Sequence, residues 1–276
     1  IIGLLEFFLI LHPKSICLIY RLIADFLAVL NLSRKWSYEL QKTASPAQIY
    51  QALKRSNPAP FAALAMFENF NIISSSPERL FSVAAGKVQT RPIAGTHPRG
   101  AGKADERLKT QLKNHPKEQA EHIMLLDLER NDLGKICQYG SVKVNQTMGL
   151  ESYQFVHHLV SNIIGELKSG VSIKELVSAL FPGGTITGCP KVRCMQIIAE
   201  LENSPRQAYT GSLGYISSNG KMDFNILIRS IIQQQNSLKF RAGAGIVFDS
   251  IAQQELAETK HKAEGILRIF PSSNAE

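Results

Sequence analysis

The pattern of apolar and polar residues predicts a mixture of helices and strands from residue 45 onward. Some stretches repeat apolar residues at helical spacing, and others are β-rich runs bounded by Gly, Pro or Asn. The expected helices cover residues 46–55, 116–133 and 172–180, and two more open at Pro190 and Ser250. The expected strands cover residues 71–83, 87–96, 141–149, 155–164, 208–217, 222–234 and 238–248.

Turn and cap signals mark the ends of several of these elements. Ala84-Ala85-Gly86 and Asn219-Gly220 each predict a hairpin between the runs that flank them. Pro116 suits the first position of a helix, and Gly134 is its expected end. Ser250-x-x-Gln253 has the spacing of a capping box, so we expect the last helix to open there.

Two glycine-rich stretches are candidates for close contact with a ligand or with other backbone. Residues 183–188 lead from a turn into the helix that opens at Pro190. Backbone N–H groups at such a position favour anions, so this turn is a candidate carboxylate cradle, although most such turns are only turns. Gly243 and Gly245 lie inside an expected strand, where glycine is unfavourable unless backbone has to come close to something.

Two pairs of glutamates share one spacing. Glu118 and Glu121 form the first pair, and Glu255 and Glu258 form the second. Residues at i and i+3 lie on one face of a helix, so each pair directs two carboxylates to one side. Two such faces that met would make a cation site, whereas the spacing alone is also common on solvated helix faces.

Composition and charge narrow the class of protein. The chain has 276 residues, of which 44% are hydrophobic and 20% are charged, which is typical of a globular protein. The net charge of +8 comes from scattered basic residues without an aromatic-and-basic stripe, so a small anionic substrate accounts for it better than nucleic acid. The four cysteines show neither C-x-x-C pairing nor metal-ligand spacing, which favours a reducing, cytoplasmic compartment.

The first residues do not fit a membrane span or a signal peptide. Residues 1–11 are nearly all apolar apart from Glu6, but the run is too short to cross a bilayer and lacks the preceding positive charge of a signal peptide. We therefore expect no membrane association. We expect residues 1–33 to be an altered or truncated N-terminal segment.

Seven ordered motifs resemble those of the chorismate-utilising enzymes. They are SSPER at 75–79, TRPIAGT at 90–96, EH at 121–122 with DLERND at 127–132, GTITGCPK at 184–191, YTG at 209–211, RAGAGIV at 241–247 and ELAET at 255–259. The resemblance implies an α+β fold in which antiparallel β-sheets pack as a sandwich with helices on the outside. It implies a chorismate-binding catalytic domain over residues 34–270, followed by a tail at 271–276.

The resemblance also implies roles for individual residues. The family's magnesium-site glutamates correspond to Glu118, Glu121, Glu255 and Glu258, and Mg²⁺ is a hard ion that prefers such oxygen ligands. The family's substrate-pocket positions correspond to Gly95, Thr96, His158, Thr185, Lys191, Tyr209, Arg229, Gly243 and Lys262. Chorismate is a dianion, so positive groups such as Lys191, Arg229 and Lys262 have to balance the remaining negative charge.

The implied chemistry adds a nucleophile at ring C2 of chorismate with loss of the C4 hydroxyl. Hydroxide is a poor leaving group near pH 7, so a positioned acid has to protonate it. Glu78 matches the family's proton donor. This role would require a raised pKa, from burial or from nearby negative charge.

Local patterns divide between two branches of the family. Residues 184–188, 210–215 and 223–226 look more like aminodeoxychorismate synthases, which aminate chorismate to 4-amino-4-deoxychorismate in the folate and 4-aminobenzoate pathway. Ala94 looks like anthranilate synthases of the tryptophan pathway, because many aminodeoxychorismate synthases carry there a lysine thought to attack the ring.

Two further expectations concern where the ammonia comes from and whether the chain is catalytically active. No cysteine has the context of a glutaminase nucleophile, so the resemblance implies a separate glutamine amidotransferase subunit as partner. A catalytically impaired remnant of the family, altered at its N-terminus, is the alternative from another class. A nucleic-acid binder is the least favoured reading.

Overall fold

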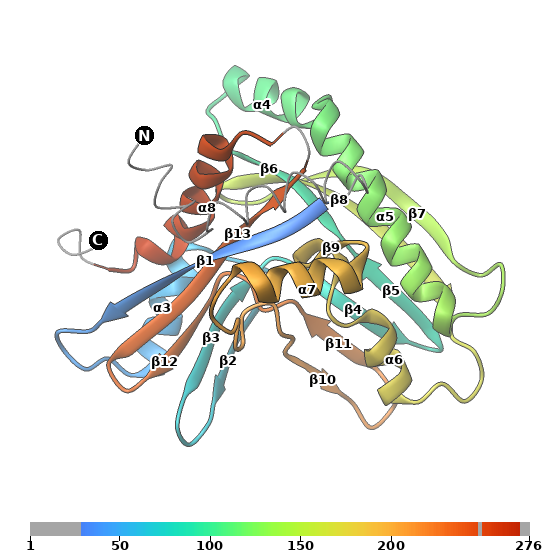
Figure 1. Ribbon diagram of the computed structural model, residues 1–276, viewed down its shortest axis with the longest axis horizontal. Coiled ribbons are helices and arrows are strands. Elements are labelled where there is room, and N and C mark those ends of the chain that lie inside the picture. Colours follow the sequence, from blue (N-terminus) through green and yellow to red (C-terminus); the bar gives the residue numbers. More distant parts are fainter. Residues whose placement is uncertain (1–28, 248–249, 271–276) are drawn as a thin grey trace. The chain divides into compact units, whose positions relative to one another are not determined.

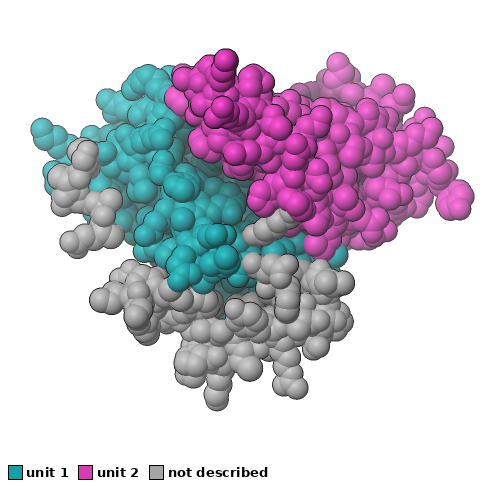
Figure 2. All heavy atoms as spheres, turned by 90° about the horizontal axis from the view of Figure 1, so that it is seen from above, with its two compact units in different colours: residues 1–77, 186–211, 227–276 teal, residues 78–185, 212–226 magenta. Residues whose placement is uncertain are grey.

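The computed structural model describes residues 29–247 and 250–270 (Figure 1). The chain divides into two compact units (Figure 2). Unit 1 comprises residues 1–77, 186–211 and 227–276, and unit 2 comprises residues 78–185 and 212–226. The expected catalytic domain, residues 34–270, is therefore shared between two units. Of the expected segments 1–33 and 271–276, only residues 29–33 lie within the described residues.

Unit 1 contains a six-stranded antiparallel sheet (Figure 1). In spatial order its strands are β2 (Phe61–Met66), β3 (Asn71–Ser76), β12 (Ser230–Gln234), β13 (Ser237–Ile246), β1 (Val29–Glu39) and β9 (Gly188–Cys189). The longest pairing joins β1 to β13, in a register that runs from Leu30 opposite Ile246 to Glu39 opposite Ser237. The sheet is thus assembled from the first and last parts of the chain.

Three helices of unit 1 pack on this sheet through two apolar clusters. These helices are α3 (Pro46–Ser56), α7 (Lys191–Leu201) and α8 (Ala252–Leu267). The first cluster joins α3 and α8 to the central strands through Ile49, Leu53, Ile73, Ile231, Leu238, Phe240, Ala242, Ala263 and Ile266. The second joins α7 to β1 through Leu30, Leu32, Cys194, Ile197, Ile198 and Leu201. Burial of these side chains supplies the hydrophobic stabilisation of the unit.

Unit 2 contains a seven-stranded antiparallel sheet. Its strands are β4 (Arg79–Ala84), β5 (Lys87–Arg91), β6 (Ile93–Pro98), β7 (Lys143–Ser152), β8 (Val156–Glu166), β10 (Gly214–Ile216) and β11 (Met222–Asn225). Its helices are α4 (Lys103–Lys113), α5 (Pro116–Ile136) and α6 (Ile173–Leu180). The one-turn 3₁₀ helix η1 (Gly184–Ile186) lies where the chain passes from unit 2 to unit 1.

The long β8 organises unit 2. It pairs with β7, with β5 through its C-terminal half and with β6 through its N-terminal half. Its buried face and the apolar side of α5 meet in a core that includes Leu125, Leu133, Leu159 and Ile163. This packing carries the first turns of α5, and with them two of the expected site glutamates, onto the sheet.

Most of the expected helices and both hairpins are confirmed. Helices α3 and α6 follow the expected ranges, and each opens on a capping box, at Ser45 and Ser172 respectively. β4 and β5 pair across Ala84–Lys87, and β10 and β11 pair across Asn219-Gly220. Helix α5 begins at Pro116 as expected.

Two helix boundaries were wrong. Helix α5 continues past Gly134 to Ile136, because the burial of Leu133 and Ile136 holds the last turn on the core while Gly134 stays on the exposed side. Ser250 does not cap α8, whose N-cap is Ile251 without a side-chain hydrogen bond. The Ser250 hydroxyl instead donates to Glu255 Oε1 at 2.7 Å.

Four expected strands were too long. Pro77 separates β3 from β4, and Pro92 separates β5 from β6, because proline has no N–H to donate to a ladder. The run 208–217 was wrong over its first half, where residues 208–213 form turns and irregular backbone before β10. The run 222–234 breaks at residues 226–229, where Leu227 exchanges backbone hydrogen bonds with Thr210 and Gly211 and Arg229 has φ of 50°.

The α+β class is confirmed by two antiparallel sheets with helices packed on them. Each unit holds one of the two sheets. The expected sandwich concerns the placement of one unit against the other, so it stays a prediction.

Replacing Gly134 by alanine tests why α5 continues through this residue. A Cβ at position 134 meets no atom within 4 Å, so Gly134→Ala is expected to raise the free energy of unfolding by about 0.5–1 kcal/mol through lower backbone entropy of the unfolded chain. Urea unfolding followed by circular dichroism measures this. As a contrast, Gly188 has φ of 119° and a Cβ there would lie 1.9 Å from the Val29 carbonyl oxygen, so Gly188→Ala should lower stability. A destabilising Gly134→Ala would contradict this account.

Candidate functional site

Unit 1 brings three of the predicted substrate residues together. Gly243 is buried on β13, and a Cβ there would lie 2.6 Å from the Leu32 carbonyl oxygen and 3.0 Å from the Tyr209 hydroxyl oxygen. From α8, the Lys262 ammonium donates to the Gly243 carbonyl oxygen at 3.1 Å. The expectation that backbone comes close to other groups at Gly243 is confirmed. The role of Tyr209, Gly243 and Lys262 in binding stays a prediction.

The glutamate pair of α8 lies beside this cluster. Glu255 is only 2% exposed and accepts a hydrogen bond from Ser250. Glu258, one turn further along, forms an ion pair with Lys262 at 2.5 Å. Lys262 therefore links the second glutamate to the Gly243 backbone, and its positive charge offsets part of the negative charge of the pair.

The remaining predicted residues of this part of the chain lie on three segments. Arg229 is the last residue of the break between β11 and β12, and its carbonyl oxygen accepts from the Ser75 backbone N–H at 3.2 Å. Lys191 is the first residue of α7, and Thr185 lies in η1. The proposed carboxylate cradle at residues 183–188 stays a prediction.

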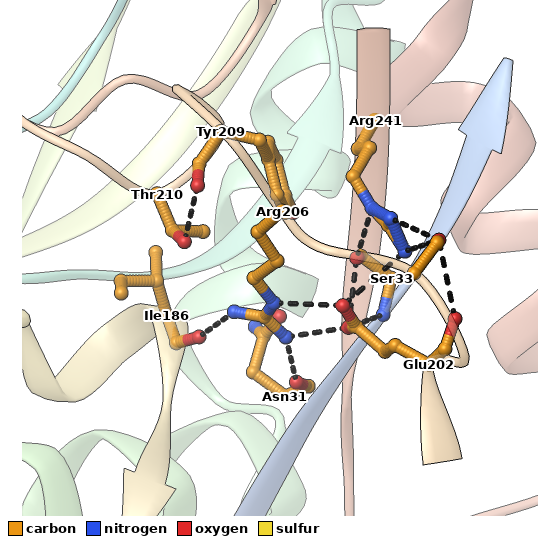
Figure 3. Close-up of polar contacts among 9 residues, drawn as sticks. Asn31, Ser33, Ile186, Glu202, Arg206, Tyr209, Thr210 and Arg241 are labelled. Carbon is orange, nitrogen blue, oxygen red and sulfur yellow. Dashed lines mark hydrogen bonds and ion pairs between the residues drawn. The ribbon is translucent and has the colours of Figure 1, made fainter. Parts of the chain in front are cut away.

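A buried ion-pair network lies next to Tyr209 (Figure 3). At the end of α7, Glu202 accepts from the Ser33 backbone N–H at 2.9 Å and from the Ser33 hydroxyl at 2.8 Å. Arg206 forks onto the same carboxylate, with its Nε 2.9 Å and its Nη2 2.6 Å from the two oxygens. Arg241 Nη2 lies 3.3 Å from Glu202 Oε2, and Arg241 Nε donates to the Ser33 hydroxyl. The network joins α7 to β1 and β13.

Arg206 extends the network to two backbone segments. Its Nη1 donates to the Ile186 carbonyl oxygen at 2.8 Å, and its Nη2 donates to the Asn31 carbonyl oxygen at 2.7 Å (Figure 3). Its guanidinium carbon lies 5.6 Å from the centre of the Tyr209 ring, within the range of a cation–π contact.

Burial sets the protonation of two members of this region. It raises the pKa of Tyr209 to about 12, against the opposite effect of Arg206, so the phenol is a neutral donor at ordinary pH. Desolvation also lowers the pKa of Arg241, although Glu202 opposes that shift. Two guanidiniums and one carboxylate leave one net positive charge near the Tyr209 ring.

In unit 2, Glu78 lies at the start of the segment leading into β4. It is 4% exposed, and its Oε1 accepts from the Ile93 backbone N–H at 3.3 Å. Its own carbonyl oxygen accepts from the Ile226 N–H at 3.0 Å, which fixes the backbone on the other side. The carboxyl group is thus held beside the strand that carries Ala94, Gly95 and Thr96.

A missing side chain at Gly95 leaves room for Glu118. Gly95 has φ of 72°, and a Cβ there would lie 3.0 Å from Glu118 Oε2 and 2.8 Å from Leu112 Cδ1. Glu118 and Glu121 lie on the first two turns of α5, as expected. Unit 2 therefore brings together Gly95, a predicted substrate residue, and Glu118, a predicted metal ligand.

The structure also pairs Thr96 with His158. The Thr96 hydroxyl lies 2.9 Å from Nδ1 of His158, which is 1% exposed on β8. The ring of Tyr153 packs at a tilt against the imidazole, with 5.7 Å between the ring centres. These contacts fix the orientation of a histidine for which the family resemblance implied a substrate-pocket position.

Several residues around these clusters were missed by the sequence interpretation. They are Asn31, Glu202 and Arg206. His122 was part of a motif but had no role assigned; its Nε2 contacts the Ser161 hydroxyl, and burial lowers its pKa to about 4. Two features of the sequence could have pointed to the network around Glu202. They are the run Ser204-Pro205-Arg206 just before the YTG motif, and Arg241, the arginine that opens RAGAGIV.

The predicted magnesium site is divided between the units. Within the described residues, no group of three or more His, Cys, Asp or Glu side chains is assembled that could hold a metal ion. Glu118 and Glu121 belong to unit 2, and Glu255 and Glu258 belong to unit 1. Their carboxylate oxygens are the donors that Mg²⁺ prefers. Convergence of the two pairs stays a prediction.

The fold and these motif positions define a class of protein. The chain belongs to the family of chorismate binding enzymes, whose family model matches residues 24–268. The expected family is thereby confirmed.

Curated relatives include both branches expected from the sequence. The chain is 46% identical over 247 residues to aminodeoxychorismate synthase component 1 of Bacillus subtilis, covering 89% of this chain and 52% of that protein. It is 45% identical over 227 residues to anthranilate synthase component 1 of Aquifex aeolicus, covering 82% and 46%. The chain therefore spans about half the length of the curated relatives it matches.

Solved structures share the fold. Anthranilate synthase component I from Streptococcus pneumoniae superposes with a TM-score of 0.82 at 39% identity, covering 92% of this chain and 56% of that one. The menaquinone-specific isochorismate synthase MenF from Escherichia coli superposes with a TM-score of 0.83 at 26% identity, covering 94% and 60%.

Two further observations concern membrane-spanning helices and the cysteine thiols. No helix in the described ranges has the length and apolar character that a bilayer crossing requires. Cys137, Cys189 and Cys194 carry free thiols, and burial raises the pKa of Cys137 and of Cys194 to about 11.

Replacing Glu202 by glutamine tests the ion-pair network. Glu202→Gln would leave the buried guanidinium of Arg241 and the partly buried guanidinium of Arg206 without their shared carboxylate, so we expect the free energy of unfolding to fall by about 3–5 kcal/mol. Glu200→Gln is the matched control, since Glu200 is half-exposed and lies 3.8 Å from Arg193, and it should change stability by at most about 1 kcal/mol. Urea unfolding measures the loss of stability in both variants. Equal losses in Glu202→Gln and Glu200→Gln would contradict the role given to Glu202.

Proposed function

We propose that the chain takes part in the magnesium-dependent amination of chorismate to 4-amino-4-deoxychorismate, with ammonia from a glutamine amidotransferase subunit. The single observation that carries this proposal is the 46% identity to aminodeoxychorismate synthase component 1 over 89% of the chain. Family membership supports chorismate as the substrate.

The residues of unit 1 suit one carboxylate of a dianionic substrate. The Tyr209 hydroxyl lies next to the Gly243 backbone, and Lys262 supplies positive charge there. Arg229 is the expected guanidinium partner, because a planar fork binds a carboxylate with two parallel hydrogen bonds. Mg²⁺, held by Glu118, Glu121, Glu255 and Glu258, would neutralise the other substrate carboxylate when bound.

Glu78 is proposed as the acid that protonates the departing C4 hydroxyl. The carboxyl group is buried, held by the Ile93 N–H and positioned beside Ala94, so it is restrained in one place rather than mobile in water. General acid catalysis of this kind contributes about 10²–10⁴-fold to rate.

Anthranilate synthase activity is the second candidate, and Ala94 favours it. Ala94 is buried in β6 opposite Leu159 and offers no nucleophile, so a covalent lysine adduct cannot form at this position. Ammonia would then attack the ring directly, at C2 on the way to anthranilate or at C4 to give 4-amino-4-deoxychorismate, with the C4 hydroxyl leaving in both cases. The 45% identity to anthranilate synthase component 1 of Aquifex aeolicus supports this candidate nearly as well.

Product analysis separates the candidates. The purified chain is incubated with chorismate, Mg²⁺ and ammonium, and products are identified by mass spectrometry. Aminodeoxychorismate supports the proposal, whereas anthranilate with pyruvate supports the second candidate. A folded chain that consumes no chorismate, alone or with a glutamine amidotransferase subunit, supports the impaired remnant.

The variant Glu78→Gln tests the proposed acid. An amide cannot deliver the proton, so we expect turnover to fall by about 10²-fold or more with chorismate binding retained. Glu106→Gln is the control, because Glu106 lies exposed on α4 and pairs only with Lys109 among the ion pairs the structure describes. Initial rates and equilibrium dialysis are measured for both, and near-full turnover of Glu78→Gln would reject the assignment.

A further inference from the structure

Tyr209 has a buried ring and a hydroxyl placed against backbone. The side chain is 7% exposed, and its oxygen lies 3.0 Å from the position a Cβ would take at Gly243. Burial fixes the ring, and the hydroxyl beside the Gly243 backbone can donate to a ligand that approaches there.

Arg206 is held rigidly beside that ring. Its side chain donates to both oxygens of Glu202 and to the carbonyl oxygens of Ile186 and Asn31. Its carbonyl oxygen accepts from the Tyr209 backbone N–H at 3.1 Å, so both residues belong to one tight turn. The guanidinium cannot move away from the ring without breaking several of these bonds.

We propose that Arg206 is a positioning residue that holds the Tyr209 ring in place and strengthens its hydroxyl as a donor to a substrate carboxylate, with Glu202 orienting Arg206. The carboxylate belongs to chorismate, so this part rests on the proposed function. The effect of Arg206 on Tyr209 does not depend on it.

Electrostatics support the proposal. The charged groups that act on the phenol are Arg206, Glu202 and Arg241, and Lys262 approaches through the Gly243 carbonyl. Both arginines lower the pKa of Tyr209, while burial and Glu202 raise it to about 12. A cation near the ring withdraws electron density from the O–H bond, and burial keeps the proton in place. The phenol is then a strong donor that stays neutral.

The first experiment follows Tyr209 directly, without substrate. A fluorinated tyrosine is inserted at position 209 by amber suppression, and its ¹⁹F resonance is titrated with pH. Arg206→Gln should move the midpoint to higher pH, since it removes the positive charge, and Arg206→Lys should move it less. Arg268→Gln is the matched control, because Arg268 lies exposed at the C-cap of α8 and pairs with Glu264. Circular dichroism shows whether each variant is folded. If Arg206→Gln does not fold, the titration of Arg206→Lys is the test.

The second experiment is a double-mutant cycle on chorismate binding, measured by equilibrium dialysis with Mg²⁺. Arg206→Lys and Tyr209→Phe are each expected to raise the dissociation constant about tenfold. In the double variant the loss should be close to that of Tyr209→Phe alone, because Arg206 acts through Tyr209. Additive losses would overturn the proposal, as would an unchanged ¹⁹F midpoint in folded Arg206 variants.

The two experiments fail in different ways. If the unaltered chain does not bind chorismate, the proposed function fails, and the ¹⁹F titration still decides whether Arg206 acts on Tyr209. If chorismate binds but the cycle is additive, the proposed function stands and the positioning role is rejected.

Discussion

The buried carboxylate of Glu202 is the interaction on which the candidate site of unit 1 depends. A carboxylate taken out of water is costly unless its oxygens are fully hydrogen-bonded and its charge is balanced. Ser33, Arg206 and Arg241 meet both requirements from different parts of the chain. The end of α7 is thereby fixed to β1 and β13, and the turn that carries Tyr209 is fixed with it.

Close backbone approach is the second constraint, and both units use it. At Gly243 the absence of a side chain lets a carbonyl oxygen, an amide and a phenol gather around one strand. At Gly95 the same absence gives a carboxylate its place. Backbone groups need no rotamer to be fixed, so a site built on them loses little side-chain entropy when a ligand binds.

Local signals in the sequence predicted local structure well. Capping at Ser45 and Ser172, the Asn219-Gly220 hairpin and the start of α5 at Pro116 each depend on neighbours within a few residues. The same kind of signal failed where packing overrode it. Gly134 did not end α5 because Leu133 and Ile136 are buried, and Ser250 bonds Glu255 instead of capping a helix.

The site was predicted in part, through motifs rather than spacing. Gly95 was found because a motif contained it, and Gly243 was found also because it lies inside an expected strand; the structure then supplied the reason for each. Glu202 was missed because two of its partners are far away in sequence: Ser33 lies 169 residues away, and Arg241 lies on β13. Long-range pairing of polar groups leaves no periodic trace, so only the fold reveals it.

The order of the strands has a consequence for how the chain folds during synthesis. The pairing of β1 with β13 joins residues near positions 30 and 246, and closing so long a loop is slow because its entropy cost precedes any contact. By contrast, β4, β5, β6, β7 and β8 follow one another along the chain and pair among themselves. A ribosome releases these strands well before β13, so unit 2 can begin to fold while β1 still lacks the neighbour that completes its sheet.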